Sequence, residues 1–317
     1  MSQPAATAPA LARTAPRVVP VQKLPDAMRS LWRAACPEAE GGDVARALVI
    51  NFVGIAAASE EFALRTATDR LLRRSPCRAF LLLVDDSVRD VQAEVAVATR
   101  CSGNLRDIVL EEIVIRLPTS WFSHLPGLLR PLLMNDLPNH LYWTGGWPRD
   151  PRAFDALLAL CDHAIVDSRD FGLPAVELDA LQTRRQAHRV TDLSWLRLRP
   201  WRRALAEAFQ RVTWTPGTAM TGTIRHGRAA TAAAILLAQW LEGRLGARIA
   251  LEDSGVDQDP APEVVVLRTA AYDLQVEARG TNLVVHVTTT DHCHLPFTVP
   301  ASRGSDGNLL AAAIDLG

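Results

Sequence analysis

The chain has 317 residues, of which 48% are hydrophobic and 22% are charged, and its formal net charge is −1. This length allows one large domain or two medium ones with hydrophobic cores. A near-neutral charge argues against a nucleic-acid partner, because such proteins bind phosphates through an excess of Lys and Arg. No apolar stretch approaches the ~18 uncharged residues that a membrane span needs. We therefore expect neither a nucleic-acid partner nor a membrane partner.

The lysine and cysteine residues of the chain exclude further classes of protein. Lys23 is the only lysine, so the body of the chain has none for a Walker-type phosphate loop or an internal Schiff base. The cysteines are widely spaced and include no C-x-x-C pair, which matches neither a disulfide scaffold nor a zinc ribbon. We expect reduced thiols and a cytoplasmic location. The cysteines are Cys36, Cys77, Cys101, Cys161 and Cys293.

Residues 1–22 are rich in Ala, Pro and Thr and lack the apolar core of a secretory signal, so we expect a disordered tail. From residue 23 to 214, short apolar strands alternate with amphipathic helices. This alternation predicts an α/β domain with a mostly parallel (mixed) sheet flanked by helices. The expected strands are Ala47–Ile55, Arg78–Val84, Ala93–Thr99, Ile108–Ile115, His140–Thr144 and His163–Val166. The expected helices are Leu24–Ala35, one capped by Ser59 and ending near Arg74, Pro126–Met134 with a bend at Pro131, Pro151–Cys161, Leu173–Gln186 and Trp201–Val212.

Residues 215–317 predict a smaller α+β domain. Thr213–Gly227 contains a proline and three glycines, which indicates a linker. A helix follows with a wide apolar face, and Gly246 is expected to end it. Arg279-Gly280-Thr-Asn282 indicates a hairpin turn. The remaining expected elements are the strands Ile249–Leu251, Val264–Arg268, Tyr272–Glu277 and Leu283–Thr290 and the helix Asn308–Ile314.

Three carboxylates follow predicted strands. Asp85, Asp86 and Asp167 lie where open α/β sheets bind ligands, and three such groups suit a divalent cation. The alternative is that they cap the turns that follow, as Asp commonly does there, and this interpretation is favoured.

His292-Cys293-His294, together with His286, has side chains that zinc accepts. Adjacent residues on a strand point to opposite faces, so at most two of them converge. Ordinary polar and turn positions are the better account. We expect no metal and no cofactor.

An aromatic segment ends one predicted strand. Trp143 and Trp147 flank a Gly-Gly turn at the edge of the sheet where ligands bind. Either these tryptophans pack in the core, or they form an aromatic platform at a binding surface. Both interpretations stay open.

The run Thr191–Leu205 interleaves two tryptophans with four arginines and has a single carboxylate, Asp192. Trp and Arg are over-represented at the energetic centres of protein interfaces. The chain also lacks G-x-G-x-x-G, G-x-S-x-G and H-E-x-x-H fingerprints, so we expect a binding protein and not an enzyme. The alternative for this run is that Trp195 and Trp201 pack their helix onto the sheet.

Four segments stand out by their order and spacing. They are Pro131-Leu-Leu…Asp136-Leu-Pro138…Tyr142-Trp143-x-Gly145, Asp162-His-Ala-Ile-Val-Asp167-Ser168, Asp192-Leu-Ser-Trp195-Leu-Arg197-Leu…Trp201-Arg202 and Ala234-Ile-Leu-Leu-Ala-Gln-Trp240-Leu-Glu-Gly-Arg-Leu245-Gly246. In these segments the chain resembles the OpcA family, over roughly residues 45–250. OpcA proteins are the glucose-6-phosphate dehydrogenase assembly proteins of bacteria.

The resemblance implies a non-catalytic partner that binds glucose-6-phosphate dehydrogenase, promotes its active oligomer and raises its activity. Replacing Arg197 and Arg199 with alanine should then preserve the fold and reduce the activation. Two other classes remain: a sugar-phosphate-binding protein or enzyme with arginine clamps, and a polyanion binder with steep salt dependence. The expected partner-binding residues are Trp143, Asp192, Trp195, Arg197, Arg199, Trp201 and Arg202.

Overall fold

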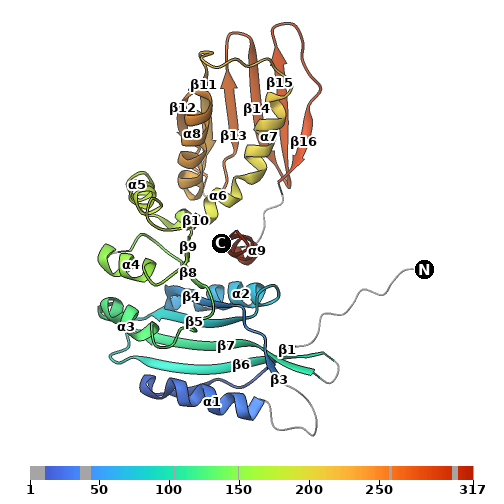
Figure 1. Ribbon diagram of the computed structural model, residues 1–317. Coiled ribbons are helices and arrows are strands. Elements are labelled where there is room, and N and C mark those ends of the chain that lie inside the picture. Colours follow the sequence, from blue (N-terminus) through green and yellow to red (C-terminus); the bar gives the residue numbers. More distant parts are fainter. Residues whose placement is uncertain are drawn as a thin grey trace, which may run out of the picture. The chain divides into compact units, whose positions relative to one another are not determined.

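The computed structural model of the chain is shown as a ribbon in Figure 1. Its contacts define two compact units. The first comprises Met1–Thr144, Pro148–Ile165 and Leu310–Gly317, and the second comprises Gly145–Trp147 and Val166–Leu309. The residues that the structure describes are 11–35, 44–102, 105–148, 150–256, 259–301 and 306–316.

The first unit is built on a large mixed sheet with the strand order β1-β6-β7-β5-β4-β8-β9. Strands β7, β5, β4 and β8 run parallel to one another, whereas β6 is antiparallel to β7. β2 adds to β6, and β3 adds to β7. The strands are β1 (Leu11–Arg13), β2 (Arg17–Val19), β3 (Val44–Arg46), β4 (Ile50–Ala57), β5 (Cys77–Val84), β6 (Gln92–Ser102), β7 (Leu105–Leu117), β8 (Asn139–Trp143) and β9 (His163–Val166).

Helices flank this sheet, with α1 packed along β6 and α2 packed on β4 and β5 (Figure 1). Short 3-10 turns precede several of them. The helices are α1 (Leu24–Ala35), α2 (Glu61–Leu72), α3 (Leu125–Leu129) and α4 (Pro151–Leu158), and the turns are η1 (Val21–Lys23), η2 (Ala58–Glu60) and η3 (Thr119–His124). The predicted range of α1 is confirmed at both ends.

The central strands are buried on both faces, as their continuous apolar runs predict. In β5 the side chains from Phe80 to Leu83 are fully buried, and in β4 Phe52, Val53 and Ile55 are almost so. A strand covered by helices on one face and by other elements on the other has no need of polar alternation. These two strands form the centre of the first unit's core.

The prediction of a disordered tail over residues 1–22 is wrong from residue 11 onward. β1 and β2 pair antiparallel with β6, so their backbone groups complete the hydrogen bonding of that strand. Val19 is also buried and adds apolar contact. Composition alone missed this, because each strand has only three residues. Residues 1–10 lie outside the described part of the chain.

Two predicted helix ends are wrong. Ser59 does not cap α2: a 3-10 turn precedes the helix, and its N-terminal residue Glu61 instead pairs with Arg65 and Arg116. The helix expected to bend at Pro131 ends at Leu129, because a proline ring cannot follow there without breaking the helical hydrogen bonds.

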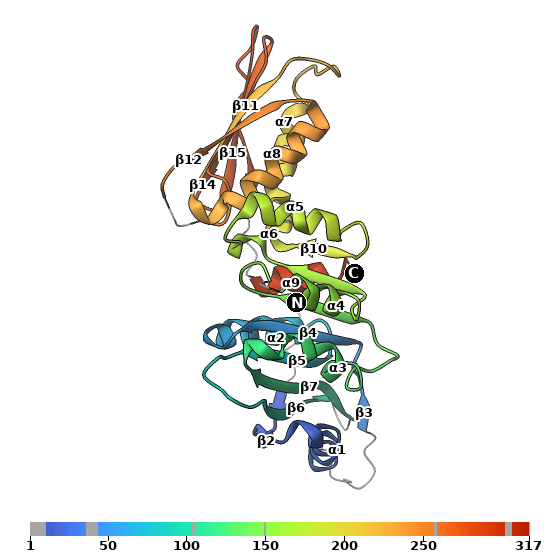
Figure 2. The same ribbon diagram turned by 90° about the vertical axis from the view of Figure 1, so that its left-hand side faces the viewer.

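The second unit contains a smaller sheet with the order β12-β11-β13-β14-β15-β16. β11 and β12 are parallel, and the other neighbours are antiparallel. Helix α7 packs on β14, β15 and β16, while α8 packs on β11 and β12 (Figures 1 and 2). The strands of this sheet are β11 (Thr221–His226), β12 (Arg248–Asp253), β13 (Val264–Arg268), β14 (Tyr272–Arg279), β15 (Asn282–Thr289) and β16 (Phe297–Pro300), and the unit also contains the short strand β10 (Val190–Asp192) outside this sheet. The helices are α5 (Pro174–Arg184), α6 (Leu193–Arg197), α7 (Arg199–Phe209) and α8 (Thr231–Leu245), with the 3-10 turns η4 (Ser168–Asp170) and η5 (Arg228–Ala230). Helix α9 (Asp306–Ile314) begins in this unit, and its residues from Leu310 onward belong to the first unit.

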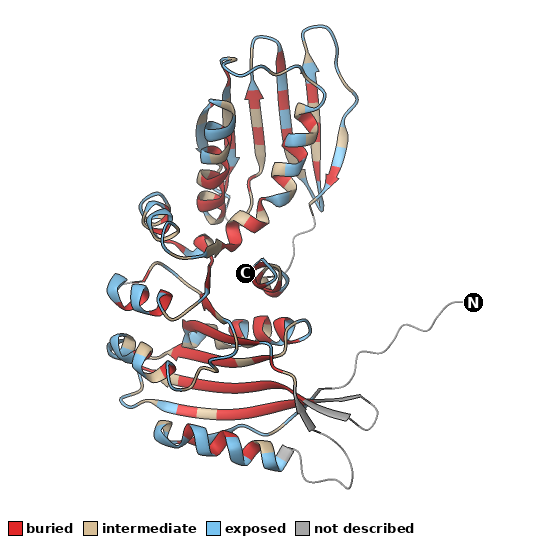
Figure 3. Ribbon diagram, in the orientation of Figure 1, coloured by how far each residue is buried: buried red, intermediate tan, exposed pale blue. Residues whose placement is uncertain are grey.

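One face of this sheet is covered, and its strands alternate accordingly between buried and exposed residues (Figure 3). The buried set includes Leu274 on β14 and Val285 on β15. Two predicted turns are confirmed. Gly246 ends α8 with a φ of 66°, and Gly280 turns the β14–β15 hairpin with a φ of 58°. Both conformations favour glycine because it lacks a Cβ.

The linker prediction for Thr213–Gly227 is wrong for its second half. That half contains β11, which lies between β12 and β13, and its Ile224 is fully buried. The linker prediction includes Gly222, but packing within the sheet requires a glycine at this position. A Cβ there would lie 2.7 Å from the backbone oxygen of Val266 and 2.6 Å from Leu267.

The predicted fold class is confirmed: a large mixed sheet flanked by helices, and a smaller unit with its own sheet and helices. The second compact unit begins upstream of residue 215, because α5, α6 and α7 have their contacts with α8 and the small sheet. The division into an N-terminal domain of residues 23–214 and a C-terminal domain of residues 215–317 stays a prediction.

Gly222→Ala should destabilise the protein by about 1–3 kcal/mol, since the added methyl group meets a backbone oxygen that cannot move aside. Gly243→Ala is the matched control. Gly243 lies in α8 with open space around its Cβ position, so alanine should stabilise the helix by about 0.5–1 kcal/mol. Chemical denaturation of the two variants measures both effects. Equal stability of the two variants would contradict the packing role of Gly222.

Candidate binding site

The Trp/Arg run forms β10, α6 and the first turns of α7, all within the second unit. α6 leads almost directly into α7 through Leu198, which has helical torsion angles and is fully buried. Pro200 follows at the start of α7, where its missing N–H costs nothing. The run is therefore a rigid helical corner.

Arg197 is the centre of an ion-pair cluster. Its guanidinium contacts both oxygens of Asp167, with Nη1–Oδ1 at 2.7 Å and Nη2–Oδ2 at 2.6 Å, and Nη2 lies 2.8 Å from Oδ1 of Asp306. Arg169 adds contacts of 3.3 Å to Asp306 and 3.4 Å to Asp167. The side chains of Arg197 and Asp167 are only 9% and 1% exposed. This cluster joins the residues after β9 to α6 and to the start of α9.

Burial and charge act in opposite directions in this cluster. Burial alone would lower the pKa of Arg197, but hydrogen bonds and charge attraction from Asp167 and Asp306 outweigh it and raise that pKa. Burial would likewise raise the pKa of Asp306, yet Arg197 and Arg169 lower it. Both groups are therefore held in their charged forms.

Asp192 has a structural position. It is fully buried, and its Oδ1 accepts hydrogen bonds from the backbone N–H groups of Ser194 (2.9 Å) and Ser168 (3.2 Å). The first of these bonds caps α6. Burial raises the pKa of Asp192, and nearby Asp167 adds to that shift. The side chain links two turns inside the second unit.

The two tryptophans of the run differ in exposure. Trp201 is 2% exposed, and this burial agrees with the alternative interpretation, in which Trp201 packs inside the protein. Trp195 is half-buried. The guanidinium of Arg202 lies over its ring, 3.7 Å from the centroid, and donates a hydrogen bond of 3.3 Å to its backbone oxygen. Stacking of this kind gives an interface a rigid aromatic and cationic surface.

Arg199 is exposed, and among the described residues its side chain has no hydrogen bond or ion pair. The neighbouring Arg203 is also exposed but pairs with Glu207 at 2.7 Å. Arg199 also repels Arg202, whose pKa is lowered first by burial and then by this repulsion. Arg199 is thus a cation that is available to a partner or ligand.

Trp143 belongs to the first unit. It is 8% exposed and packs against Phe122 and Phe154, with ring centroids 5.7 and 5.1 Å away. Trp147 is half-buried against Phe171 in the second unit. Of the two positions left open for Trp143, the structure places it in the core. A partner contact by Trp143 remains only a prediction.

The carboxylates considered as metal ligands have local partners. Asp85 accepts from the backbone N–H and hydroxyl of Ser87, and Asp86 accepts from both groups of Thr119. Among the described residues no three His, Cys, Asp or Glu side chains are grouped in a way that suits a metal ion, and this includes His292-Cys293-His294. The same residues include no helix long and apolar enough to cross a membrane.

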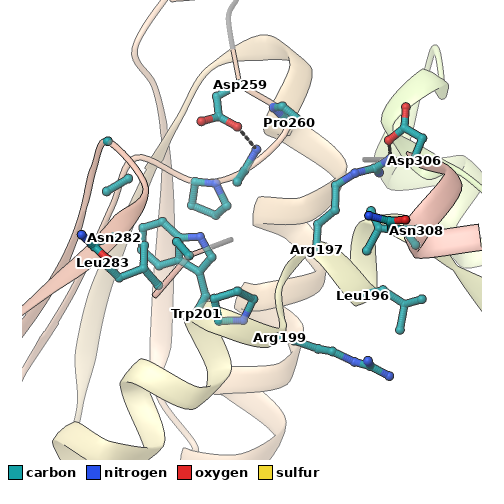
Figure 4. Close-up of a pocket in the computed structure, with 17 residues that line it drawn as sticks. Leu196, Arg197, Arg199, Trp201, Asp259, Pro260, Asn282, Leu283, Asp306 and Asn308 are labelled. Carbon is teal, nitrogen blue, oxygen red and sulfur yellow. Dashed lines mark hydrogen bonds and ion pairs between the residues drawn. The ribbon is translucent and has the colours of Figure 1, made fainter. Parts of the chain in front are cut away.

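A pocket of about 440 Å³ opens beside the helical corner (Figure 4). Its walls come from the α6–α7 junction, the loop at Asp259–Pro262, the β14–β15 hairpin and the start of α9. Most of the wall is apolar, from Leu196, three prolines, Trp201, Leu283 and Leu309. Its polar side chains are those of Arg197, Arg199, Asp259, Asn282, Asp306 and Asn308.

Reasoning from the sequence missed Asp306, Asn282 and Asn308 as members of this site. They lie about 80 to 110 residues from the Trp/Arg run and belong to no motif. Only Asn282 carried any signal, because it closes the predicted hairpin. Asp167 was considered as a metal ligand, whereas it is the main ion-pair partner of Arg197.

The fold and this site define a two-sheet α/β protein with a tryptophan- and arginine-rich helical corner. Residues 68–183 match the family model described as the glucose-6-phosphate dehydrogenase subunit N-terminal domain. Residues 188–316 match the model described as the C-terminal domain of the same subunit. The two matches together cover most of the chain, which therefore belongs to the OpcA family.

Two cyanobacterial relatives carry the name OxPP cycle protein OpcA. The protein of Nostoc punctiforme is 29% identical over 185 residues, which cover 56% of this chain and 39% of the relative. The protein of Synechocystis is 28% identical over 147 residues, covering 44% of this chain and 30% of the relative. The chain thus aligns with less than half the length of either relative.

Solved structures with a related arrangement include a levoglucosan dehydrogenase in complex with NADH and L-sorbose. It is 11% identical with a TM-score of 0.48, and the match covers 84% of this chain and 88% of that one. An NAD-binding oxidoreductase from Klebsiella pneumoniae is 11% identical with a TM-score of 0.45 over the same shares. At this level of similarity no activity transfers to the chain.

Arg197→Ala should destabilise the protein by about 3–5 kcal/mol, because it leaves the buried carboxylate of Asp167 with only the longer 3.4 Å contact to Arg169. The ion pair thus argues against the expectation that this substitution preserves the fold. Arg199→Ala, two residues further on, removes the same charge from an exposed position and should change stability by less than about 0.5 kcal/mol. Urea unfolding of both variants measures the difference, and equal effects would refute the structural role of Arg197.

Asp306→Asn should lower stability at neutral pH but not in acid. The pKa of Asp306 is lowered from its ordinary value of 3.8, so its ion pairs contribute stability above that pH and lose it as the pH falls through the folded-state pKa. The unfolding curves of wild type and variant should converge below pH 3.8. Measuring both from pH 7 downward tests this, and a constant difference would contradict it.

Proposed function

We propose that this chain is a non-catalytic partner of glucose-6-phosphate dehydrogenase that binds the enzyme and favours its active oligomer. The main support is that both halves of the chain match family models described as domains of a glucose-6-phosphate dehydrogenase subunit. The relatives named for the OxPP cycle are consistent with a role in the oxidative pentose phosphate pathway. A cytoplasmic location, where that enzyme works, belongs to the same proposal.

The physical basis of activation is a shift between states of the enzyme. If the chain binds the active oligomer more tightly than other states, it raises the population of that oligomer by no more than the ratio of the affinities. A tenfold ratio corresponds to about 1.4 kcal/mol, which one or two interface hot spots can supply. No chemical step by the chain is needed for this effect.

The exposed part of the helical corner is the proposed contact surface. Arg199 is free of partners among the described residues, and Arg202 is held in place by its stacking on Trp195. A preorganised guanidinium loses little entropy on binding a carboxylate of a partner. The buried Asp192, Arg197 and Trp201 support the corner from inside. Of the expected partner-binding residues, we therefore propose that Trp195, Arg199 and Arg202 contact the enzyme directly.

Purified chain should co-elute with the glucose-6-phosphate dehydrogenase of the same organism in size-exclusion chromatography and raise its rate of NADPH formation. The rate is measured with and without the chain at micromolar concentrations, and the size of the enzyme is followed by light scattering. Neither co-elution nor a change in rate would refute the proposal.

The Arg199→Ala/Arg202→Ala double variant then tests the surface. It should need about tenfold more protein for half-maximal activation, since interface hot spots contribute upwards of 1 kcal/mol each. The matched control is Arg225→Ala/Arg248→Ala, which removes two exposed arginines from β11 and β12. Activation by the double variant at the level of wild type would exclude this surface while leaving the proposed partner untouched.

A further inference from the structure

The pocket beside the helical corner has the properties of a small-molecule site. Its volume of about 440 Å³ falls within the range of roughly 300–1,000 Å³ that ligand pockets occupy. All of its lining residues belong to the second unit. A largely apolar wall with a few polar side chains is the usual composition of such sites.

The polar side chains of this pocket divide into occupied and available groups. Arg197 and Asp306 are occupied with each other, and Asp259 accepts a hydrogen bond from the backbone N–H of Ala261 (Figure 4). Arg199, Asn282 and Asn308 are exposed, and among the described residues their side chains have no hydrogen bond or ion pair. Among the described lining residues, one cation and two amides are therefore available to a ligand.

These available groups indicate which chemistry fits. Each amide has both a donor and an acceptor, which is the combination that pairs with a hydroxyl group. A guanidinium is the side chain best suited to a phosphate, which it binds through two parallel N–H groups. Figure 4 shows Asn282 on one side of Trp201 and, on the other side, the side chain of Arg199 extending away from Trp201 at the end near Leu196. The ligand should carry its anion at that end and its hydroxyl groups between the asparagines.

The start of α7 favours an anion for a separate reason. Arg199, Arg202 and Arg203 lie in its first turns, where the helix dipole is positive, and the first turn contains neither an acidic residue nor a capping side chain. Of the three, Arg203 is paired with Glu207, whereas Arg199 has no such partner among the described residues. Cations at this end of a helix are unfavourable. An anion bound at Arg199 would relieve this repulsion.

We propose that the pocket lined by Arg199, Asn282 and Asn308 binds a small hydroxylated phosphate monoester, with the phosphate on Arg199 and the hydroxyl groups on the two asparagines. This site goes beyond the proposed partner role and does not depend on it. Arg199 belongs both to this site and to the proposed contact surface, whereas Asn282 and Asn308 belong to the pocket alone.

Titration calorimetry of the isolated chain, with no dehydrogenase present, tests the site. The probes are glucose 6-phosphate, glucose and inorganic phosphate. Saturable binding of glucose 6-phosphate, at least tenfold tighter than binding of either fragment, is the expected result. Equal binding of inorganic phosphate and the ester would overturn the proposal, because it would show an anion site without a role for the pocket. Absence of saturable binding of the ester would also overturn it.

Three variants locate the ligand. Arg199→Ala should weaken binding of glucose 6-phosphate by tenfold or more, whereas Arg203→Ala should leave it within twofold. Arg203 is the matched control because it is an exposed arginine of the same helix that pairs with Glu207 and does not line the pocket. Ala301→Leu fills the pocket without changing charge and should also abolish binding. Unchanged binding in Ala301→Leu, with a normal melting curve, would place the ligand outside the pocket and overturn the proposal.

Because these titrations use the isolated chain, their outcome is separate from that of the activation assay. Loss of ligand binding in Ala301→Leu together with full activation of the dehydrogenase would assign the pocket and the partner surface to different functions. Failure of activation with intact ligand binding would instead remove the proposed partner and keep the pocket.

Discussion

The ion pair between Arg197 and Asp167 is the interaction on which the helical corner depends. The two side chains make contacts of 2.7 and 2.6 Å, and both are almost completely buried. A buried charge is tolerated only when an opposite charge and hydrogen bonds replace its hydration. The positions of α6 and of the residues after β9 are therefore coupled, and the contact with Asp306 extends the coupling to the start of α9. This cluster therefore fixes the position of the helical corner within the second unit.

The same constraint divides the Trp/Arg run into two sets of residues. Arg197, Trp201 and Asp192 face inward and stabilise the corner, while Arg199, Arg202 and Trp195 keep exposed surface. A rigid inner set lowers the entropy that the outer set loses on binding. In the first unit, arginines serve buried carboxylates in the same way: Arg78 pairs with Glu111 at 2.7 Å, and Arg65 pairs with Glu112 at 2.6 Å. With a single lysine in the chain, arginine carries out nearly all of this pairing.

Strong local signals predicted much of the fold correctly. The amphipathic pattern of α1, the apolar runs of β5 and β9, and the glycines at 246 and 280 each determine a local conformation by themselves. The errors fall where distant partners decide. β1 and β11 are strands because neighbouring strands offer hydrogen bonds to them, and neither has a strong pattern of its own. The residue type of Ser59 predicts a helix cap, but Ser59 lies inside a 3-10 turn and Glu60 occupies the N-cap position of α2.

Apolar periodicity, turn residues and ordered motifs are properties of short segments, so the fold class, the order of most elements and the family could be predicted from the sequence. The composition of the Trp/Arg run also predicts a binding segment. Which of its side chains face inward depends on the tertiary structure, since their burial involves residues as distant as Asp167 and Asp306. The pocket could likewise not be predicted from the sequence. Asn282 and Asn308 lie beside the helical corner only because the small sheet and α9 have folded.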